Sequence, residues 1–528
     1  MEKKRRITRY LLYIAALLPL MLFREITPNN ELRYLSIVDE ALRDGHIFAF
    51  YNHGVPYADK PPLFFWLMMG LKLLFGRHIP FALSMLSVIP AFVTVCVFDR
   101  WCSRELIDKQ RSAAAAMLFS RVYFIASAIV IRQDMMMTMF ITLSLYTFYR
   151  MYEGDMSPRL KIAFPIYVFL ALFSKGAVGI LVPLVSIPVY LLISKEFKTI
   201  GRYWGWLTWG ILILLCGGWF FAAWREGGMD YLNNLLFHQT VDRAVNAFHH
   251  KEPFWFYLAH VWYIIYPWAF AVVGVIVIAL ISNQKMSDLA RFFVTVSVTI
   301  IVMLSLVSGK VDIYFLPAIG FLVYGAVMLF KKFRYPDFIS VMLYIPAFVF
   351  AVAPVVVTIL KKFIDIPYVD LFPIYVFLPL LIFGALACIF IRQGRLENGI
   401  ISLAMSIYVT LFVFGFHVEK LNPSIGYRTL VEEAMQTANK EGITRFGVAV
   451  KEDGTTVMRR ADNIDVYLGH EAEMIPEDTL KNSSDSIIGN SNGIIIFTRD
   501  INRKPTYVIL KNSPRPAYFE QEQDASQL

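Results

Sequence analysis

The stretch IYFLPAIGFLVYGAVMLF, residues 313–330, contains no charged side chain. A helix of this length rises about 27 Å at 1.5 Å per residue, close to the ~30 Å hydrocarbon core of a bilayer. Comparable apolar runs occupy residues 10–23, 177–194 and 259–281. The sequence therefore predicts membrane-spanning helices, which recur along the chain as far as residue 416.

The composition supports a membrane protein. Of 528 residues, 57% are hydrophobic, 15% aromatic and only 17% charged. Such a chain has too few polar side chains to cover a water-soluble globule of this size. The formal charge of +9 lies largely in short loops between apolar runs, so we interpret it as a topology signal and expect no nucleic-acid partner.

The loops that follow every second predicted span are rich in Lys and Arg. They are residues 3–6, 100–111, 150–161, 195–202, 285–291, 331–334 and 392–395. Because basic loops stay on the cytoplasmic side, the pattern predicts a multi-pass protein of the bacterial inner membrane with a cytoplasmic N-terminus. With about 13 spans the C-terminus is then periplasmic, and only the pair at 361–362 lies on the unexpected side.

The other set of loops is longer and mixes acids, bases, aromatics and amides. These loops are residues 24–77, 132–134, 175, 224–257 and 308–312. We therefore expect function on the periplasmic face. No internal repeat is evident, which disfavours the inverted-repeat transporters.

The chain changes character after the last apolar run. We expect a mostly α transmembrane domain over residues 1–416 and a small periplasmic accessory α/β domain over residues 417–528. The tail pattern predicts one helix and three strands. They cover residues 429–440, 446–450, 493–497 and 506–510.

The first periplasmic loop contains two features. Apolar side chains at helical spacing, with Pro28 before them and Gly45 after them, predict an amphipathic interfacial helix. Farther on, Lys60 precedes Pro61 and Pro62 at the mouth of an apolar hairpin. This lysine could bind a phosphate head group or simply solvate the loop.

Isolated charges mark the ends of other spans. Asp134 separates two largely apolar runs, where it could be functional or could pair with Arg132 to close a helical hairpin. Lys175 and Lys310 stand between apolar runs and could bind a ligand or snorkel to head groups. Together these residues form a cationic basin that contains an acid. A polyprenyl-phosphate sugar needs cations for the departing phosphate and a group that accepts the acceptor's proton.

An ordered set of motifs carries a family resemblance. The motifs are Asn30-Glu31-Leu32-Arg33-Tyr34, Val55-Pro56-Tyr57-Ala58-Asp59-Lys60-Pro61-Pro62, Asp134, Lys175-Gly176, Arg243 ahead of Pro253-Phe254-Trp255-Phe256-Tyr257, and Ser308-Gly309-Lys310 with Tyr314-Phe315-Leu316-Pro317. In order and spacing the chain resembles the aminoarabinose transferase and protein O-mannosyltransferase-like family (PMT-type, glycosyltransferase families 39 and 83). The dense part of the match covers residues 1–330.

The resemblance implies a GT-C fold and an inverting sugar transfer from undecaprenyl phosphate at the periplasmic face. The acceptor would be lipid A, a protein or another glycan. By position, Lys60, Arg243 and Tyr314 match phosphate-site residues. Arg33, Lys175 and Lys310 match supporting cations, and Asp134 matches a family carboxylate.

The chain departs from the family at Asn30, where the family usually has an aspartate next to Glu31. An amide can orient a hydroxyl but cannot serve as a base near neutral pH. Either Glu31 or Asp134 then accepts the proton, or the chain is an inactive member that only binds the donor.

No cofactor is indicated. A divalent metal is conceivable but lacks support, because His238, His249 and His250 do not have ligand spacing. The four cysteines lie in or beside apolar runs and are assigned structural roles. The competing function is a transporter or flippase for a lipid-linked sugar, and a polysaccharide polymerase or ligase is a third possibility. The gathering of polar residues on one face argues against a transporter.

The charge pattern makes a direct prediction of topology. A reporter fused after Gly415 or at the C-terminus will be periplasmic, and one inserted within residues 100–111 will be cytoplasmic. Paired alkaline phosphatase and fluorescent-protein fusions measure this. A cytoplasmic C-terminus would separate the proposed functional loops from one another.

Overall fold

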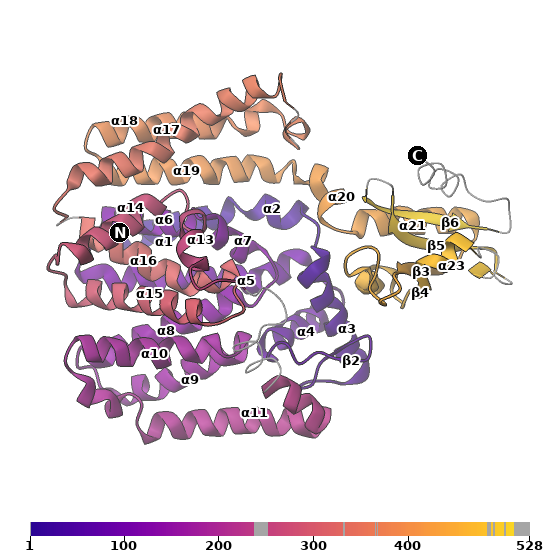
Figure 1. The fold of residues 1–528 in the computed structure, drawn as a ribbon, viewed down its shortest axis with the longest axis horizontal. Helices are drawn as coiled ribbons and strands as arrows, with labels where there is room; N and C mark the ends of the chain where they lie inside the picture. Colours follow the sequence, from indigo (N-terminus) through magenta and orange to yellow (C-terminus); the bar gives the residue numbers. More distant parts are fainter. Residues whose placement is uncertain are drawn as a thin grey trace. The chain divides into compact units, whose positions relative to one another are not determined.

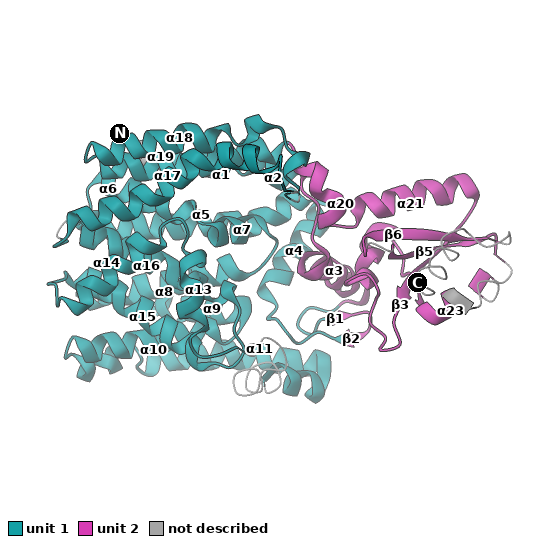
Figure 2. Cartoon of the chain, turned by 45° about the horizontal axis from the view of Figure 1, so that its top comes forward, with its two compact units in different colours: residues 1–22, 46–50, 56–416 teal, residues 23–45, 51–55, 417–528 magenta. Residues whose placement is uncertain are grey.

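The computed structural model describes residues 2–236, 252–330, 333–364, 366, 368–482, 487–488, 491–500 and 503–511 (Figure 1). The chain divides into two compact units (Figure 2). Unit 1 comprises residues 1–22, 46–50 and 56–416, and unit 2 comprises residues 23–45, 51–55 and 417–528. Most of the first loop up to residue 55 therefore belongs to the same unit as the C-terminal tail.

Unit 1 is a bundle of helices. The α-helices are α1 (Glu2–Ala15), α2 (Leu18–Phe23), α4 (Leu63–Phe75), α5 (Pro80–Trp101), α6 (Asp108–Phe119), α7 (Val122–Ile129), α8 (Asp134–Tyr152), α9 (Pro158–Lys175), α10 (Val178–Ile193), α11 (Trp206–Asn233), α13 (Phe256–Ile264), α14 (Ala269–Ile281), α15 (Asp288–Leu306), α16 (Leu316–Phe330), α17 (Pro336–Leu360), α18 (Leu378–Arg392) and α19 (Leu396–Gly415). Short 3-10 turns join them: η2 (Cys102–Arg104), η3 (Phe197–Arg202), η5 (Asp312–Phe315), η6 (Val369–Leu371) and η7 (Ile374–Val376).

Among the described residues, seven helices are long and apolar enough to cross a membrane, or nine if each of two bent helix pairs is one span. One bent pair is α6 and α7, which meet at 70°. Helices α4, α10 and α14 are apolar but shorter. The sequence pattern predicts about 13 spans because it also includes shorter or more polar helices such as α8 and α9. The expected class, a mostly α multi-pass membrane protein, is confirmed.

The single span expected over residues 259–281 is divided in the structure. Helix α13 ends at Ile264 and α14 begins at Ala269. Pro267 lies in the gap, where its missing N–H and its ring prevent a continuous helix. The helix expected over 177–194 is α10, which is shorter than the helices that are long enough to cross a membrane, and the span expected over 313–330 is confirmed as η5 followed by α16.

Helix α16 is the centre of the bundle, with 83% of its most apolar window buried. The ring of Phe98 packs against Phe321 and Tyr324, at centroid separations of 5.0 and 5.2 Å. It also lies over Gly320, where an added Cβ would overlap the ring. The glycine therefore lets α16 approach α5 closely.

Unit 2 begins with the first loop, in which η1 (Pro28–Leu32) leads into α3 (Arg33–Asp44). Gly45 ends α3 with a φ of 79°, a left-handed conformation that glycine adopts without strain. The helix expected between Pro28 and Gly45 is confirmed. The short strands β1 (Tyr51–Asn52) and β2 (Val55–Pro56) follow it.

The tail of unit 2 is a four-stranded sheet with helices. Its elements are η8 (Val418–Leu421), α20 (Asn422–Ile425), α21 (Arg428–Glu441), β3 (Arg445–Val450), η9 (Ala461–Ile464), α22 (Asp465–Leu468), β4 (Glu473–Pro476), α23 (Glu477–Asn482), β5 (Ile494–Arg499) and β6 (Pro505–Leu510). The strand order is β4-β3-β5-β6, and only β6 is antiparallel to its neighbour. The predicted tail helix and three strands are confirmed. Strand β4 was not predicted, because three of its four residues are exposed and give no apolar run.

Candidate active site

Asp134 and Lys175 meet because α8 and α9 are consecutive antiparallel helices. Asp134 is the first residue of α8 and Lys175 is the last residue of α9. A carboxylate at a helix N-terminus and a cation at a helix C-terminus each complement the helix dipole. Gly176 then turns the chain with a φ of 107°, a conformation that L side chains rarely adopt.

Asp134 is fully buried and accepts hydrogen bonds from two cations. Its Oδ2 lies 3.0 Å from Nε of Arg132, and its Oδ1 accepts from Nζ of Lys175. The hydroxyl of Ser87 on α5 holds the linker in place, at 2.9 and 3.0 Å from the carbonyl oxygens of Val130 and Arg132. The ion pair with Arg132, one of the two roles considered for Asp134, is therefore present.

Two further candidates lie near this pair. Nζ of Lys175 is 4.5 Å from the ring centroid of Tyr314, which belongs to η5. The charge of Lys60, at the mouth of α4, acts on the Asp134 carboxylate together with the charges of Lys175 and Arg132. The structure thus brings Lys60, Asp134, Lys175 and Tyr314 together, so that several cations surround one carboxylate. Such a site favours an anion.

Lys310 has another local role. Its side chain is buried, and its Nζ donates to the carbonyl oxygens of Glu252 and Val307 at 2.8 and 2.6 Å. It therefore joins the segment before α13 to the end of α15.

Arg243 and the histidines His238, His249 and His250 lie outside the described residues. Within the described ranges, no group of three or more His, Cys, Asp or Glu side chains could hold a metal ion.

Glu31 is fully buried in unit 2 and is held by Arg24 and Thr27. The two terminal nitrogens of Arg24 donate to its two carboxylate oxygens at 2.9 and 2.7 Å. The backbone N–H and hydroxyl of Thr27 donate to Oε2 at 2.9 and 2.8 Å. These four bonds satisfy the buried carboxylate of Glu31 and close the turn of η1. The sequence pattern did not identify Arg24, because a basic residue at the end of a span is common.

Asn30 and Arg33 lie on the same turn. Nη2 of Arg33 donates to Oδ1 of Asn30 at 3.3 Å. The amide at position 30 therefore still accepts a hydrogen bond from a cation, as a carboxylate would, but it carries no charge.

The tail holds the segment that carries these residues. Glu25 is buried, and its carboxylate accepts from the backbone N–H groups of Arg428 and Thr429 at 2.9 and 3.0 Å and from the Thr429 hydroxyl. It thus caps the first turn of α21, whose free N–H groups favour an anion. Asn422 joins the same segment through the Phe23 carbonyl and the Glu25 N–H, at 2.9 and 3.0 Å.

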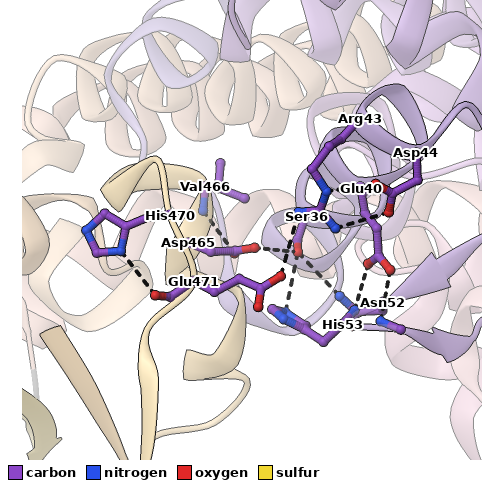
Figure 3. Close-up of polar contacts among 11 residues, drawn as sticks. Ser36, Glu40, Arg43, Asp44, Asn52, His53, Asp465, Val466, His470 and Glu471 are labelled. Atoms are coloured by element: carbon purple, nitrogen blue, oxygen red, sulfur yellow. Dashed lines mark hydrogen bonds and ion pairs between the residues drawn. The ribbon is translucent and has the colours of Figure 1, made fainter.

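A second set of contacts ties α3 to the tail (Figure 3). The hydroxyl of Ser36 donates to Oδ2 of Asp465 at 3.1 Å, and Nδ2 of Asn52 donates to Oδ1 of Asn463 at 2.9 Å. Burial raises the pKa of the Asp465 carboxyl, against the opposing effects of His53 and the Ser36 hydrogen bond. Glu40 holds the turn after β1 by accepting from the N–H groups of His53 and Gly54.

The structure also reveals a polar cluster that the motifs did not indicate. The Asp312 carboxylate lies 2.7 Å from Nδ1 of His260 and accepts from the hydroxyls of Tyr123 and Tyr263 at 2.9 and 2.6 Å. Asp312 precedes Tyr314 on η5 by two residues. Nε2 of His260 has no hydrogen-bond partner within the described ranges, and the side chain is 32% exposed. An imidazole with one nitrogen held by a carboxylate is oriented so that the other nitrogen can accept a proton. The only sequence signal was that Asp312 ends a loop on the polar face.

The chain is similar in sequence to known transferases. Residues 59–220 match the model of the family described as dolichyl-phosphate-mannose-protein mannosyltransferase. An undecaprenyl phosphate-alpha-4-amino-4-deoxy-L-arabinose arabinosyl transferase from Pseudomonas savastanoi pv. phaseolicola is 27% identical over 249 residues, 46% of each chain. A similarly named transferase from Pseudomonas fluorescens is 26% identical over 57% of this chain and 53% of its own. The chain spans about half the length of these curated relatives.

A solved structure extends the likeness to the whole fold. ArnT from Cupriavidus metallidurans bound to undecaprenyl phosphate superimposes with a TM-score of 0.73 at 17% identity, over 95% of this chain and 98% of that one. Its apo structure gives a TM-score of 0.71. The GT-C fold and the resemblance inferred from the motifs are confirmed.

The tail contacts generate a prediction about Glu25. Glu25→Ala leaves three partly buried donors at the start of α21 without their carboxylate acceptor, which costs roughly 1–3 kcal/mol. Hydrogen–deuterium exchange in the first turn of α21 should therefore accelerate at least about fivefold. Glu432→Ala is the matched control, because Glu432 is an exposed carboxylate on the same helix that pairs with Arg428. Equal exchange in both variants would show that Glu25 does not hold the tail.

Proposed function

We propose that this chain is a membrane glycosyltransferase that moves a sugar from a polyprenyl-phosphate donor to lipid A, a protein or another glycan. The transfer takes place at the periplasmic face of a bacterial inner membrane. The proposed orientation has a cytoplasmic N-terminus and a periplasmic C-terminus.

The observation that carries the proposal is the cation-rich cluster around Asp134. Lys175 and Arg132 are held in hydrogen-bonding positions by one buried carboxylate, and Lys60 adds a third charge. Three cations act on one buried carboxylate, and a group of positive charges of this kind is suited to binding a phosphate. A polyprenyl phosphate supplies that anion and develops further negative charge as it departs. The donor named for the similar transferases has the same chemistry.

In the proposed reaction an acceptor oxygen attacks the anomeric carbon on the side opposite the phosphate. The bond from this carbon to the phosphate oxygen breaks, its electron pair leaves with the phosphate, and the configuration inverts. Lys60, Arg243 and Tyr314 hold the phosphate, and Lys175 supports it. Arg33 binds Asn30, and Lys310 binds the carbonyl oxygens of Glu252 and Val307, so we assign neither of them a direct contact with the phosphate.

A hydroxyl acceptor must also lose a proton. Glu31 accepts four hydrogen bonds and Asp134 pairs with two cations, so both carboxylates are engaged. Their ion pairs support a positioning role for Asp134 and a structural role for Glu31. We assign proton acceptance from a hydroxyl to Nε2 of His260, since Asp312 holds the other ring nitrogen.

Mass spectrometry of lipid A and of glycoproteins tests the function. Cells with the gene should gain a sugar in one of these pools that cells without it lack. Lys60→Ala and Arg243→Ala should each reduce this modification by at least about tenfold, because a charged hydrogen bond to a phosphate contributes roughly 1.5–3 kcal/mol.

Arg104→Ala is a control, because Arg104 is an exposed cation paired with Glu153. If neither pool changes while the protein still binds the donor, the protein is a donor-binding protein and not a transferase. Normal modification by both phosphate-site variants would remove these residues from the site.

The roles proposed for Asp134 and His260 predict different kinetic effects when each residue is substituted. Asp134→Asn should raise the KM for the donor about tenfold or more, because Lys175 and Arg132 lose the charge that positions them. His260→Gln should lower kcat for a hydroxyl acceptor by about 10²-fold or more and leave the donor KM nearly unchanged.

Donor binding separates these roles from a general loss of structure. His260→Gln should bind the donor as tightly as the wild type, whereas Asp134→Asn should bind it at least about tenfold more weakly. If Asp134→Asn instead lowers kcat by about 10²-fold and leaves the donor KM intact, Asp134 is the base.

A further inference from the structure

A cavity lies at the opposite end of α8 and α9 from the Asp134–Lys175 pair. Its volume is about 340 Å³, and its lining includes Met151 near the end of α8 and Lys161 in the first turns of α9. The 17 residues from Asp134 to Met151 separate the two sites by about 26 Å along α8. The cavity is therefore distinct from the candidate active site.

The lining suits an anion. Lys161 and Arg202 supply two positive charges, no carboxylate lines the cavity, and neither cation forms an ion pair within the described ranges. Residues 205–208, at the start of α11, also line it. The N–H groups of the first turn of a helix have no carbonyl partner inside the helix, and the α11 start lacks a side-chain cap. These donors add to the two cations.

The exposed side of α11 continues from the cavity as an apolar face. Leu207, Leu214 and Phe221 follow one another at intervals of seven residues, so they lie on one side of the helix, and they are 52%, 73% and 62% exposed. Space beyond Gly210 and Gly217 is open. Trp206, at the cavity, is 94% exposed, as expected of an indole at a membrane interface. The cavity therefore has a positively charged lining next to a surface suited to acyl chains.

From this arrangement we propose that the cavity binds the phosphate head group of an anionic phospholipid from the leaflet opposite the active site. Lys161 and Arg202 contact the phosphate, and the acyl chains lie along Leu207, Leu214 and Phe221. Basic pockets between membrane helices bind anionic head groups in this way. The proposal does not depend on the transferase activity.

Native mass spectrometry of the delipidated full-length protein tests it, with phosphatidylglycerol, phosphatidylcholine of the same acyl chains, and inorganic phosphate as probes. Phosphatidylglycerol should bind at least about tenfold more tightly than phosphatidylcholine. The double variant Lys161→Ala/Arg202→Ala should weaken phosphatidylglycerol binding by about tenfold or more, since each cation near an anionic head group contributes a several-fold effect.

The matched control is Arg159→Ala/Lys198→Ala. It also removes one Lys and one Arg from α9 and η3, but neither residue lines the cavity. Its affinity for phosphatidylglycerol should stay within about twofold of the wild type. Equal losses in the two double variants, or equal binding of both lipids, would overturn the proposal. Saturable binding of inorganic phosphate that displaces the lipid would identify a free-phosphate site instead.

The variant Leu214→Trp tests the apolar face separately from the charged lining. It keeps both cations and replaces an exposed side chain on the surface proposed for the acyl chains. It should also weaken phosphatidylglycerol binding while its midpoint of thermal unfolding stays that of the wild type, which excludes loss of folding as the cause. If this variant binds the lipid normally, the acyl chains do not lie on α11.

Discussion

The buried ion pair of Asp134 with Lys175 and Arg132 is the interaction on which the candidate site depends. An isolated carboxylate in this apolar hairpin would be strongly disfavoured, so Asp134 requires cationic partners. Removing one partner of a buried pair typically costs about 3–5 kcal/mol, because the other charge stays buried. The pair therefore holds the adjoining ends of α8 and α9 together. It also fixes two cations, and that local excess of positive charge favours a phosphate.

The two buried glutamates of the first loop follow the same rule, because a buried charge needs several hydrogen-bond partners. Glu31 and Glu25 lie six residues apart and each accepts bonds from backbone and side-chain donors. Glu31 closes its own turn, whereas Glu25 caps α21 about 400 residues later in the sequence. The tail is thus part of the unit that carries Asn30 and Arg33. It holds the conformation of this segment through Glu25 and Asn422.

The presence of Asn30, where the family that the chain resembles usually has an aspartate, has a simpler meaning in this setting. Asn30 still accepts a hydrogen bond from Arg33, so the local geometry does not require a carboxylate. Proton acceptance does require a group that can change its charge. The cluster of Asp312 and His260 offers one on η5 and α13, two residues away from Tyr314. An acceptor oxygen that is already ionised would need no base at all.

The sequence by itself determined the class of fold. Apolar runs of bilayer length predict helices because lipid leaves backbone groups no other partners, and the alternating pattern of the tail predicts strands. It also identified Asp134, Lys175 and Lys60 as notable, because isolated charges beside apolar runs are costly. Periodicity could not predict which charges would pair, since Arg24, Glu25 and His260 find their partners through contacts that spacing does not encode. Only the tertiary structure decided that Glu31 is engaged by Arg24, that Lys310 binds backbone carbonyls, and that the first loop and the tail form one unit. The reason is physical: a buried polar group must be satisfied, but donors from any part of the chain can satisfy it.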